Sequence, residues 1–182
     1  MNIVLLGAPG TGKSLQSDLI SKEYSIPHIS IGHILRENVA NNTDLGMIAR
    51  PYLEKGELIP NSISIPLITD RLLRANKGFV LDGFPRNIKD ANALDIIMDE
   101  SNRKLDLAIH IDVDDETLIG RLLARGRPDD IPEVIVNRFV VYRRETEPVL
   151  EYYRNRGLLV TIDGKQSVQE IFEDIKELLN QY

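Results

Sequence analysis

Short apolar runs alternate with longer amphipathic segments along this chain. Four of the runs are almost continuously hydrophobic, which is typical of parallel strands buried on both faces. They are residues 3–6, 78–81, 107–111 and 158–162, with residues 26–30 as a weaker fifth candidate. The clearest helix is expected after the capping-box sequence at Ser167, where apolar residues recur at helical spacing. The pattern predicts an α/β fold with a central parallel sheet of about five strands.

Two stretches fall outside this alternation. Residues 31–74 are a long, almost entirely helical excursion that is interrupted by Pro51, Gly56, Pro60 and Pro66. Residues 126–132 are a short polar loop between two helical segments that carry arginines. Because doubly wound sheets bind ligands at the carboxyl ends of their strands, we expect both stretches to form flaps over that edge of the sheet.

The composition is that of an ordinary globular domain, and it excludes several classes of protein. The chain has 182 residues, 28 acidic against 22 basic side chains, and no cysteine. The lack of cysteine excludes disulfide scaffolds, thiolate zinc sites and cysteine nucleophiles. No apolar run approaches the roughly 20 residues of a membrane span, and no signal sequence precedes the first strand. We therefore expect a single-domain cytoplasmic protein without a membrane partner.

The basic residues are unevenly distributed. Fourteen of the 22 are arginines, and one stretch without lysine contains Arg121, Arg125, Arg127, Arg138, Arg143 and Arg144. In an acidic chain such a cluster favours a small polyanion over nucleic acid, whose binding requires a wide basic face. The alternative is a solvated helix face on which these arginines pair with Glu133, Glu145 and Glu147. The cluster alone does not decide between the two.

Residues 7–14, Gly-Ala-Pro-Gly-Thr-Gly-Lys-Ser, match the phosphate-binding loop pattern in full. They lie directly after the first predicted strand and directly before an amphipathic segment. The glycines allow successive N–H groups to face an anion, the following helix directs its positive end at the same point, and Lys13 adds a full charge. The motif predicts a bound triphosphate, with Ser14 as a ligand of Mg²⁺. Its glycine spacing differs from the G-x-G-x-x-G of dinucleotide-binding proteins.

A second candidate motif is Leu-Asp-Gly-Phe-Pro-Arg at residues 81–86, which follows the next strong strand. Its carboxylate, Asp82, is expected at the same edge of the sheet as the phosphate loop, where it can hold Mg²⁺ through water. An Asp-Gly pair by itself is usually only a turn, so the prediction depends on this placement.

The order and spacing of the motifs resemble the adenylate kinases, of the nucleoside monophosphate kinase family, over essentially the whole chain. The matching elements are residues 7–14, 26–30 with Arg36, 56–60, 81–86, Arg121 with Arg125, 127–130, Arg138 and 163–164. The resemblance implies a three-layer P-loop fold in a single domain over residues 1–182. It also implies a helical flap for the monophosphate at about 31–60 and a very short lid at about 126–137. The implied reaction is Mg²⁺-dependent transfer of the terminal phosphoryl group of ATP to a nucleoside monophosphate, with AMP favoured.

The resemblance also assigns roles to particular residues. The catalytic residues are Lys13, Arg86, Arg125, Arg127 and Arg138. The ATP-binding residues are Gly10, Thr11, Gly12, Lys13, Ser14, Leu15, Arg121, Arg125, Gly164 and Gln166. The monophosphate-binding residues are Ile31, Arg36, Glu57, Leu58, Ile59, Gly83, Phe84, Pro85, Arg86, Asp90, Arg127 and Arg138. Ser14 and Asp82 hold Mg²⁺. Asp129 and Asp130 are expected to secure the lid by pairing with arginines.

The chain departs from the family pattern at several positions. Ser14-Leu15 replaces the usual Gly-Thr, and Ile31 and His33 replace Thr and Asp. Asp90 replaces the glutamine that usually reads the acceptor adenine. An ionised carboxylate accepts hydrogen bonds but donates none, so it would face the adenine ring nitrogen without a proton between them. This predicts that AMP is the best acceptor but that its selectivity over GMP and CMP is reduced. A kinase that prefers GMP or CMP is the alternative.

A P-loop ATPase or nucleotide switch without a small-molecule acceptor is the other alternative. Arg36 and Arg86 argue against this alternative, because a simple hydrolase requires no cations on the acceptor side. Phosphoryl transfer to an anionic phosphate requires positioning and positive charge but no general base. We expect ATP and a nucleoside monophosphate as partners, no nucleic acid, and a monomer.

Overall fold

The computed structural model describes residues 1–181. Its sheet is entirely parallel, with strand order β2-β3-β1-β4-β5. The strands are β1 Asn2–Leu6, β2 His28–Ser30, β3 Phe79–Asp82, β4 Leu107–Asp112 and β5 Leu159–Asp163. The five predicted runs are thus all strands, and the α/β prediction is confirmed. Strand β4 ends one residue later than its apolar run, and β5 begins and ends one residue later. Asp82 is the last residue of β3.

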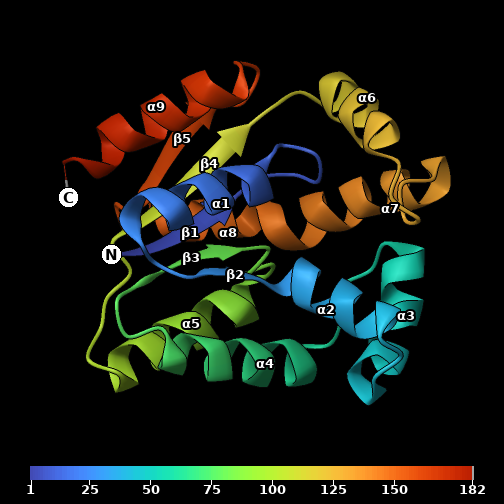
Figure 1. The fold of residues 1–182 in the computed structure, drawn as a ribbon, viewed down its shortest axis with the longest axis horizontal. Helices are drawn as coiled ribbons and strands as arrows, with labels where there is room; N and C mark the ends of the chain where they lie inside the picture. Colours follow the sequence, from blue (N-terminus) through green and yellow to red (C-terminus); the bar gives the residue numbers. More distant parts are fainter. Residues whose placement is uncertain (182) are drawn as a thin grey trace.

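Helices connect every pair of strands (Figure 1). They are α1 Lys13–Tyr24, α2 Ile31–Ala40, α3 Asp44–Lys55, α4 Asn61–Arg74, α5 Ile88–Glu100, α6 Asp115–Arg125, α7 Pro132–Val141, α8 Glu147–Arg154 and α9 Val168–Leu179. A π-helical turn, η1 Tyr142–Thr146, joins α7 to α8. The capping box predicted at Ser167 is present at the start of α9.

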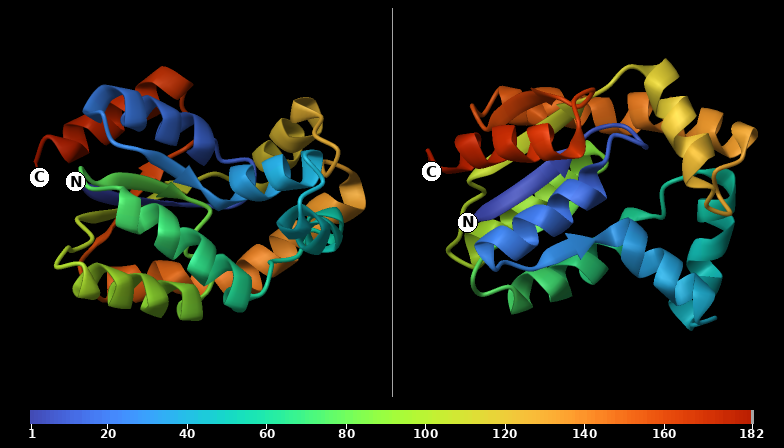
Figure 2. Two further views of the ribbon diagram at one scale, coloured as in Figure 1. Left: turned by 60° about the horizontal axis from the view of Figure 1, so that its bottom comes forward. Right: turned by 45° about the horizontal axis from the view of Figure 1, so that its top comes forward.

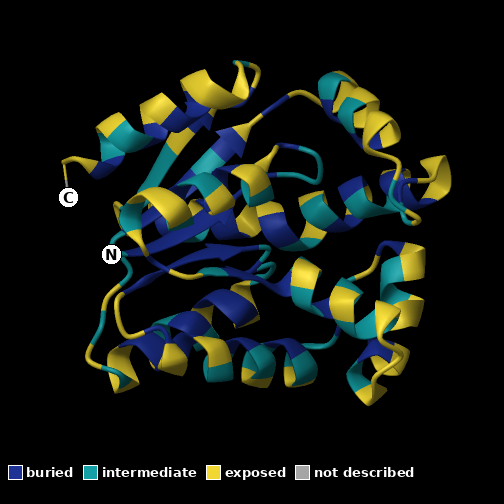
Figure 3. Cartoon of the chain, in the orientation of Figure 1, coloured by how far each residue is buried: buried dark blue, intermediate teal, exposed yellow. Residues whose placement is uncertain are grey.

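The helices cover both faces of the sheet, which gives three layers. Alternate residues of a strand point to opposite faces, so Ile3 and Leu5 pack into one core while Val4 and Leu6 pack into the other. The first core includes α1 and α9, and the second includes α4, α5 and α8. Figure 3 shows β1 and β3 as buried along their whole length, β5 as partly exposed, and exposed residues on the outer sides of the helices. Among the described residues, no helix is long and apolar enough to cross a bilayer.

The excursion between β2 and β3 consists of α2, α3 and α4. Gly56, in the left-handed region at φ 71°, ends α3, and Pro60 caps α4. Pro51 and Pro66, in contrast, lie inside α3 and α4, so the prediction that they interrupt helical structure is wrong. An internal proline removes one backbone hydrogen bond, and here the turns on either side of it stay helical.

Two helical hairpins project beyond the carboxyl ends of the strands and face each other (Figure 2). One is α2 with α3, and the other is α6 with α7. The loop between α6 and α7 comprises only residues 126–131, because Pro132 already begins α7. The hairpins touch: Asn137 Nδ2 donates a 2.7 Å hydrogen bond to the Lys55 carbonyl, and a Cβ on Gly56 would lie 2.8 Å from the Val134 carbonyl. The space between them is therefore closed over the sheet edge.

The α2–α3 hairpin depends on a glycine, and this gives a stability prediction. A Cβ on Gly46 would lie 2.0 Å from the Asn38 carbonyl oxygen, whereas Gly120, also helical, has no atom within 4 Å of such a Cβ. We expect Gly46→Ala to lower the free energy of unfolding by about 1–3 kcal/mol because the helices must separate. Gly120→Ala should raise it by about 0.5–1 kcal/mol, because alanine favours the helix. Thermal unfolding of both variants checks the pair, and equal melting temperatures would contradict this packing.

Candidate active site

A cavity of about 380 Å³ lies at the carboxyl ends of the strands, under the two hairpins. Most of the residues that the sequence nominates line it: Gly10, Gly12, Lys13, Ser14, Leu15, Ile31, Arg36, Glu57, Leu58, Asp82, Gly83, Pro85, Arg86, Arg121, Arg125, Arg127 and Arg138. The nominated residues outside its lining are Thr11, Ile59, Phe84, Asp90, Gly164 and Gln166. The cavity thus joins the phosphate loop, the α2–α3 hairpin and the α6–α7 hairpin in one site.

The phosphate loop has the backbone that its glycines allow. Gly7, Gly10 and Gly12 have φ of 144°, 95° and 92°, and a Cβ on Gly7 would lie 2.6 Å from the Ile111 carbonyl. Gly12 caps α1 without a side chain, so the first N–H groups of the helix are left for an anion. This is the arrangement that the motif predicts.

The Lys13 side chain is folded back onto the loop. Its Nζ donates to the carbonyls of Gly7 and Ala8 at 2.7 and 2.8 Å. Burial lowers the pKa of Lys13 to about 8, with Asp82 opposing this and the charges of Arg138 and Arg125 adding to it. Burial and the neighbouring cations destabilise the charged form of Lys13. The negative charge of a bound phosphate would stabilise that form.

Ser14 and Asp82 meet at the end of β3, beside the loop. Ser14 Oγ donates to Asp82 Oδ2 at 2.5 Å, and Ser30 Oγ donates to the same oxygen at 3.2 Å. Burial acts to raise the pKa of Asp82, but hydrogen bonds from His28 and Ser14 and the charge of Lys13 outweigh it, so the pKa lies below its usual value. An ionised carboxylate next to a hydroxyl suits Mg²⁺, which takes few protein oxygens and fills its other positions with phosphate and water.

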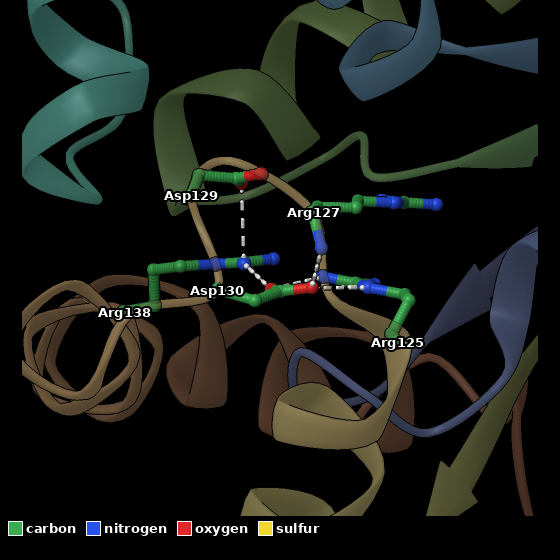
Figure 4. A network of polar contacts seen from close by, with 5 residues as sticks. All are labelled: Arg125, Arg127, Asp129, Asp130 and Arg138. Atoms are coloured by element: carbon green, nitrogen blue, oxygen red, sulfur yellow. Dashed lines mark hydrogen bonds and ion pairs between the residues drawn. The ribbon is translucent and has the colours of Figure 1, made fainter.

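In and around the loop between α6 and α7, Asp130 accepts most of the hydrogen bonds that arginines donate to carboxylates (Figure 4). Arg125 donates to it twice, from Nε at 2.8 Å and Nη2 at 2.6 Å. The Arg127 backbone N–H donates at 3.1 Å and Arg138 Nη1 at 3.3 Å. Asp129 accepts only from Arg138, at 3.3 Å. The expectation that both aspartates pair with arginines is confirmed, and Asp130 makes most of the contacts.

These contacts keep Asp130 ionised. Burial acts to raise the pKa of Asp130, but the hydrogen bonds from Arg125 and Arg127 and the charges of Arg125 and Arg138 hold it below its usual value. The carboxylate is therefore a fixed negative charge between guanidinium groups that would otherwise repel one another.

In the part of the chain that the structure describes, the guanidinium groups of Arg36, Arg86 and Arg127 donate no hydrogen bond to a carboxylate, although Arg86 Nε lies 3.6 Å from Asp90 Oδ2. Among residues 1–181, no carboxylate lies within 4 Å of the charged nitrogens of Arg36 or Arg127. Burial and the charge of Arg127 lower the pKa of Arg36 to about 10, which still leaves it cationic at neutral pH. Arg86 is 12% exposed, and its Nε and Nη2 are buried without a hydrogen-bond partner. These are donors prepared for an anion that is not part of the protein.

The structure does not bring Asp90 to the cavity. The side chain is fully buried and its carboxylate accepts from Asn61, Ser64 and the backbone of Arg86. Both oxygens are thus engaged inside the protein, at the start of α5, and neither faces the space for an acceptor base. The mismatch with adenine that the sequence suggests does not arise in this geometry.

Of the other nominated residues outside the lining, Gly164 contacts a residue that lines the cavity. Arg121 lines the cavity, and its Nη2 donates to the Gly164 carbonyl at 3.0 Å, so Gly164 orients the arginine. The Gln166 side chain instead donates to Asp174 at 2.8 Å and to the Asp163 carbonyl at 3.3 Å. Thr11, Ile59 and Phe84 are buried. Thr11 contacts Lys13, whose Nζ lies 3.1 Å from its Oγ1.

The residues of the lining that sequence reasoning missed include Val141, Tyr142 and Thr146. They belong to the end of α7 and the π-helical turn η1, which widens the helix by one residue and changes the side chains that face the cavity. Thr146 also donates from Oγ1 to the Arg86 carbonyl at 2.8 Å. No motif marks such a turn in the sequence.

The cavity thus has the phosphate-loop backbone at the end of β1 on one side and the guanidinium-bearing residues Arg36, Arg86 and Arg127 on the other. Two groups of potential phosphate-binding donors that line one cavity are typical of a P-loop phosphotransferase.

The comparisons with known proteins specify the class. The adenylate kinase family model matches residues 5–158. The chain is 46% identical over 186 positions to an adenylate kinase of Azobacteroides pseudotrichonymphae, with 99% of this chain and 97% of the relative covered. It is 40% identical to an adenylate kinase of Methanosarcina barkeri, with 100% of both covered, and 43% identical to one of Leuconostoc mesenteroides, with 98% and 97% covered.

The chain belongs to the adenylate kinase family, and the enzyme transfers phosphoryl groups to nucleoside monophosphates. Relatives differ in length: the alignment with the Methanosarcina protein spans 214 positions for the 182 residues of this chain, whereas that with the Leuconostoc protein spans 181. A compact form of the enzyme is therefore shared with other members of the family.

The lid contacts give a prediction that separates its two aspartates. We expect Asp130→Ala to lower kcat by about 10²- to 10³-fold, because it releases arginines that face the transferring group. Asp129→Ala removes one 3.3 Å contact and should lower kcat less than tenfold. A coupled assay of ADP formation measures both, with thermal unfolding to confirm that each variant is folded. Equal effects of the two substitutions on kcat would contradict the claim that Asp130, rather than Asp129, holds the arginines.

Proposed function

We propose that this protein catalyses the reversible, Mg²⁺-dependent transfer of the terminal phosphoryl group of ATP to AMP, forming two ADP. The observation that carries the proposal is that Arg36, Arg86 and Arg127 line the same cavity as the phosphate loop, and that among residues 1–181 neither Arg36 nor Arg127 has a carboxylate partner. A hydrolase requires no such cations, because water carries no charge. AMP is proposed as the acceptor because the relatives named above are adenylate kinases.

In this proposal the triphosphate of ATP lies in the loop, with N–H groups of α1 and the Lys13 ammonium on its oxygens. The Arg121 guanidinium, fixed by the Gly164 carbonyl, provides a flat surface for the donor base. Ser14 and Asp82 would hold Mg²⁺, which would supply positive charge to the phosphate oxygens.

The acceptor phosphate needs no general base, since its oxygen is already an anionic nucleophile. Arg36 and Arg86 hold that phosphate from the side of the α2–α3 hairpin. Arg125 and Arg138, held by Asp130, lie where negative charge spreads over the transferred group. The contact between Asn137 and Lys55 closes the two hairpins over the phosphates and excludes water. One chain supplies all of these groups, so the proposal requires no second subunit.

An assay of acceptors tests the proposed reaction. Purified protein is given MgATP with AMP, GMP, CMP or UMP, and ADP formation is followed. We expect AMP to have the highest kcat/KM and chelation of Mg²⁺ with EDTA to stop the reaction. Preference for GMP or CMP would overturn the choice of acceptor, and turnover of ATP without any acceptor dependence would overturn the proposed reaction itself.

A matched pair of arginine variants tests the acceptor side. Arg36→Ala should raise the KM for AMP by about 10²-fold or more, with the KM for ATP little changed, because a charged hydrogen bond to phosphate is lost. Arg74→Ala is the control, since that side chain is 78% exposed and pairs only with Asp70 at the far end of α4. If Arg36→Ala raised the KM values for both nucleotides equally, the residue would not belong to the acceptor site.

A further inference from the structure

We propose that Asp90 is a positioning residue for Arg86: its buried carboxylate fixes the guanidinium that receives the acceptor phosphate, and it takes no part in reading the acceptor base. The inference rests on the proposed function, because Arg86 is placed on the acceptor phosphate there. It replaces a base-reading role at this position with a role directed at the phosphate.

The first observation is that the Asp90 carboxylate is saturated inside the protein. Its Oδ1 accepts from Asn61 Nδ2 at 2.6 Å and from Ser64 Oγ at 3.2 Å. Its Oδ2 accepts from the Arg86 backbone N–H at 3.1 Å and lies 3.6 Å from Arg86 Nε. The side chain is 0% exposed. Both carboxylate oxygens are therefore engaged by groups of the protein.

The second observation is that Arg86 is held at both ends of its backbone. Asp90 accepts from its N–H, and Thr146 Oγ1 donates to its carbonyl. The side chain lines the cavity with Nε and Nη2 buried and without hydrogen-bond partners. Asp90 lies four residues further along, so its carboxylate flanks the guanidinium on the protein side and leaves the cavity side open.

The energetic reason is the cost of an isolated buried cation. Without a nearby negative charge, a guanidinium in this position would turn toward solvent and would have to be reordered each time a nucleotide binds. A carboxylate that is itself fixed by Asn61 and Ser64 keeps the guanidinium in place beforehand. Preorganised donors bind a phosphate more tightly than flexible ones, because less freedom is lost on binding.

The two roles of Asp90 make different predictions about selectivity. A residue that acts through the phosphate affects every nucleoside monophosphate equally, since all carry the same phosphate. A residue that reads the base changes the ratio between them. In Asp90→Asn the shape is kept and the negative charge is lost. We expect the affinities for AMP, GMP and CMP, measured by calorimetry, to fall by the same factor of about tenfold or more, with MgATP affinity unchanged.

A double-mutant cycle tests whether Asp90 acts through Arg86. In an Arg86→Ala background, Asp90→Asn should cause no further loss in kcat/KM for AMP, because the group that it positions is gone. Asp95→Asn is the matched control: it makes the same chemical change on the same helix, but at a residue that contacts Tyr152 and lies outside the cavity lining. It should leave all nucleotide affinities unchanged.

Should Asp90→Asn fail to fold, Asn61→Ala replaces it, since that variant keeps the charge and removes the 2.6 Å hydrogen bond that orients it. It should weaken AMP, GMP and CMP equally, by a smaller factor. The inference is overturned by a shift of more than about fivefold in the AMP to GMP affinity ratio in either variant, or by additive effects in the cycle. Failure of the proposed function is seen separately, as an absence of acceptor-dependent turnover in the unmodified protein.

Discussion

The structure depends on keeping many cations close together in one buried cavity before any phosphate has arrived. Like charges in a low-dielectric cavity repel strongly, and burial adds to the cost. The lowered pKa values of Lys13 and Arg36, about 8 and about 10, report that cost. Among residues 1–181, the buried carboxylates are Asp82, Asp90 and Asp130, and each lies against the cations of this site.

The fold supplies the rigid frame that these charges require. Parallel pairing of β1 with β3 sets the register that brings the phosphate loop and Asp82 to the same edge of the sheet. The two hairpins then add most of the remaining guanidinium groups, and they meet at Gly56, where a side chain would not fit beside α7. The α2–α3 hairpin reaches the α6–α7 hairpin directly, although the loop between α6 and α7 is short.

The sequence was sufficient for the parts of the site that follow from local pattern. Continuous apolar runs predict buried parallel strands, and a full phosphate loop between strand and helix fixes its own backbone. Asp90 shows where such reasoning stops. Its spacing from Arg86 is visible in the sequence, but the direction of its carboxylate is set by Asn61 and Ser64, which are 29 and 26 residues away. The π-helical turn that brings Thr146 to Arg86 likewise leaves no pattern, because its register depends on tertiary packing.

The most direct measurement of whether the opposed cations serve transfer between two phosphates is ³¹P NMR of the protein with MgATP and AMP. It follows ATP, AMP, ADP and inorganic phosphate in one sample. The account predicts that two ADP appear for each ATP and AMP consumed, with no accumulation of inorganic phosphate, because the closed cavity holds the second phosphate as acceptor and excludes water. Release of inorganic phosphate in step with ATP loss, with AMP unchanged, would contradict it.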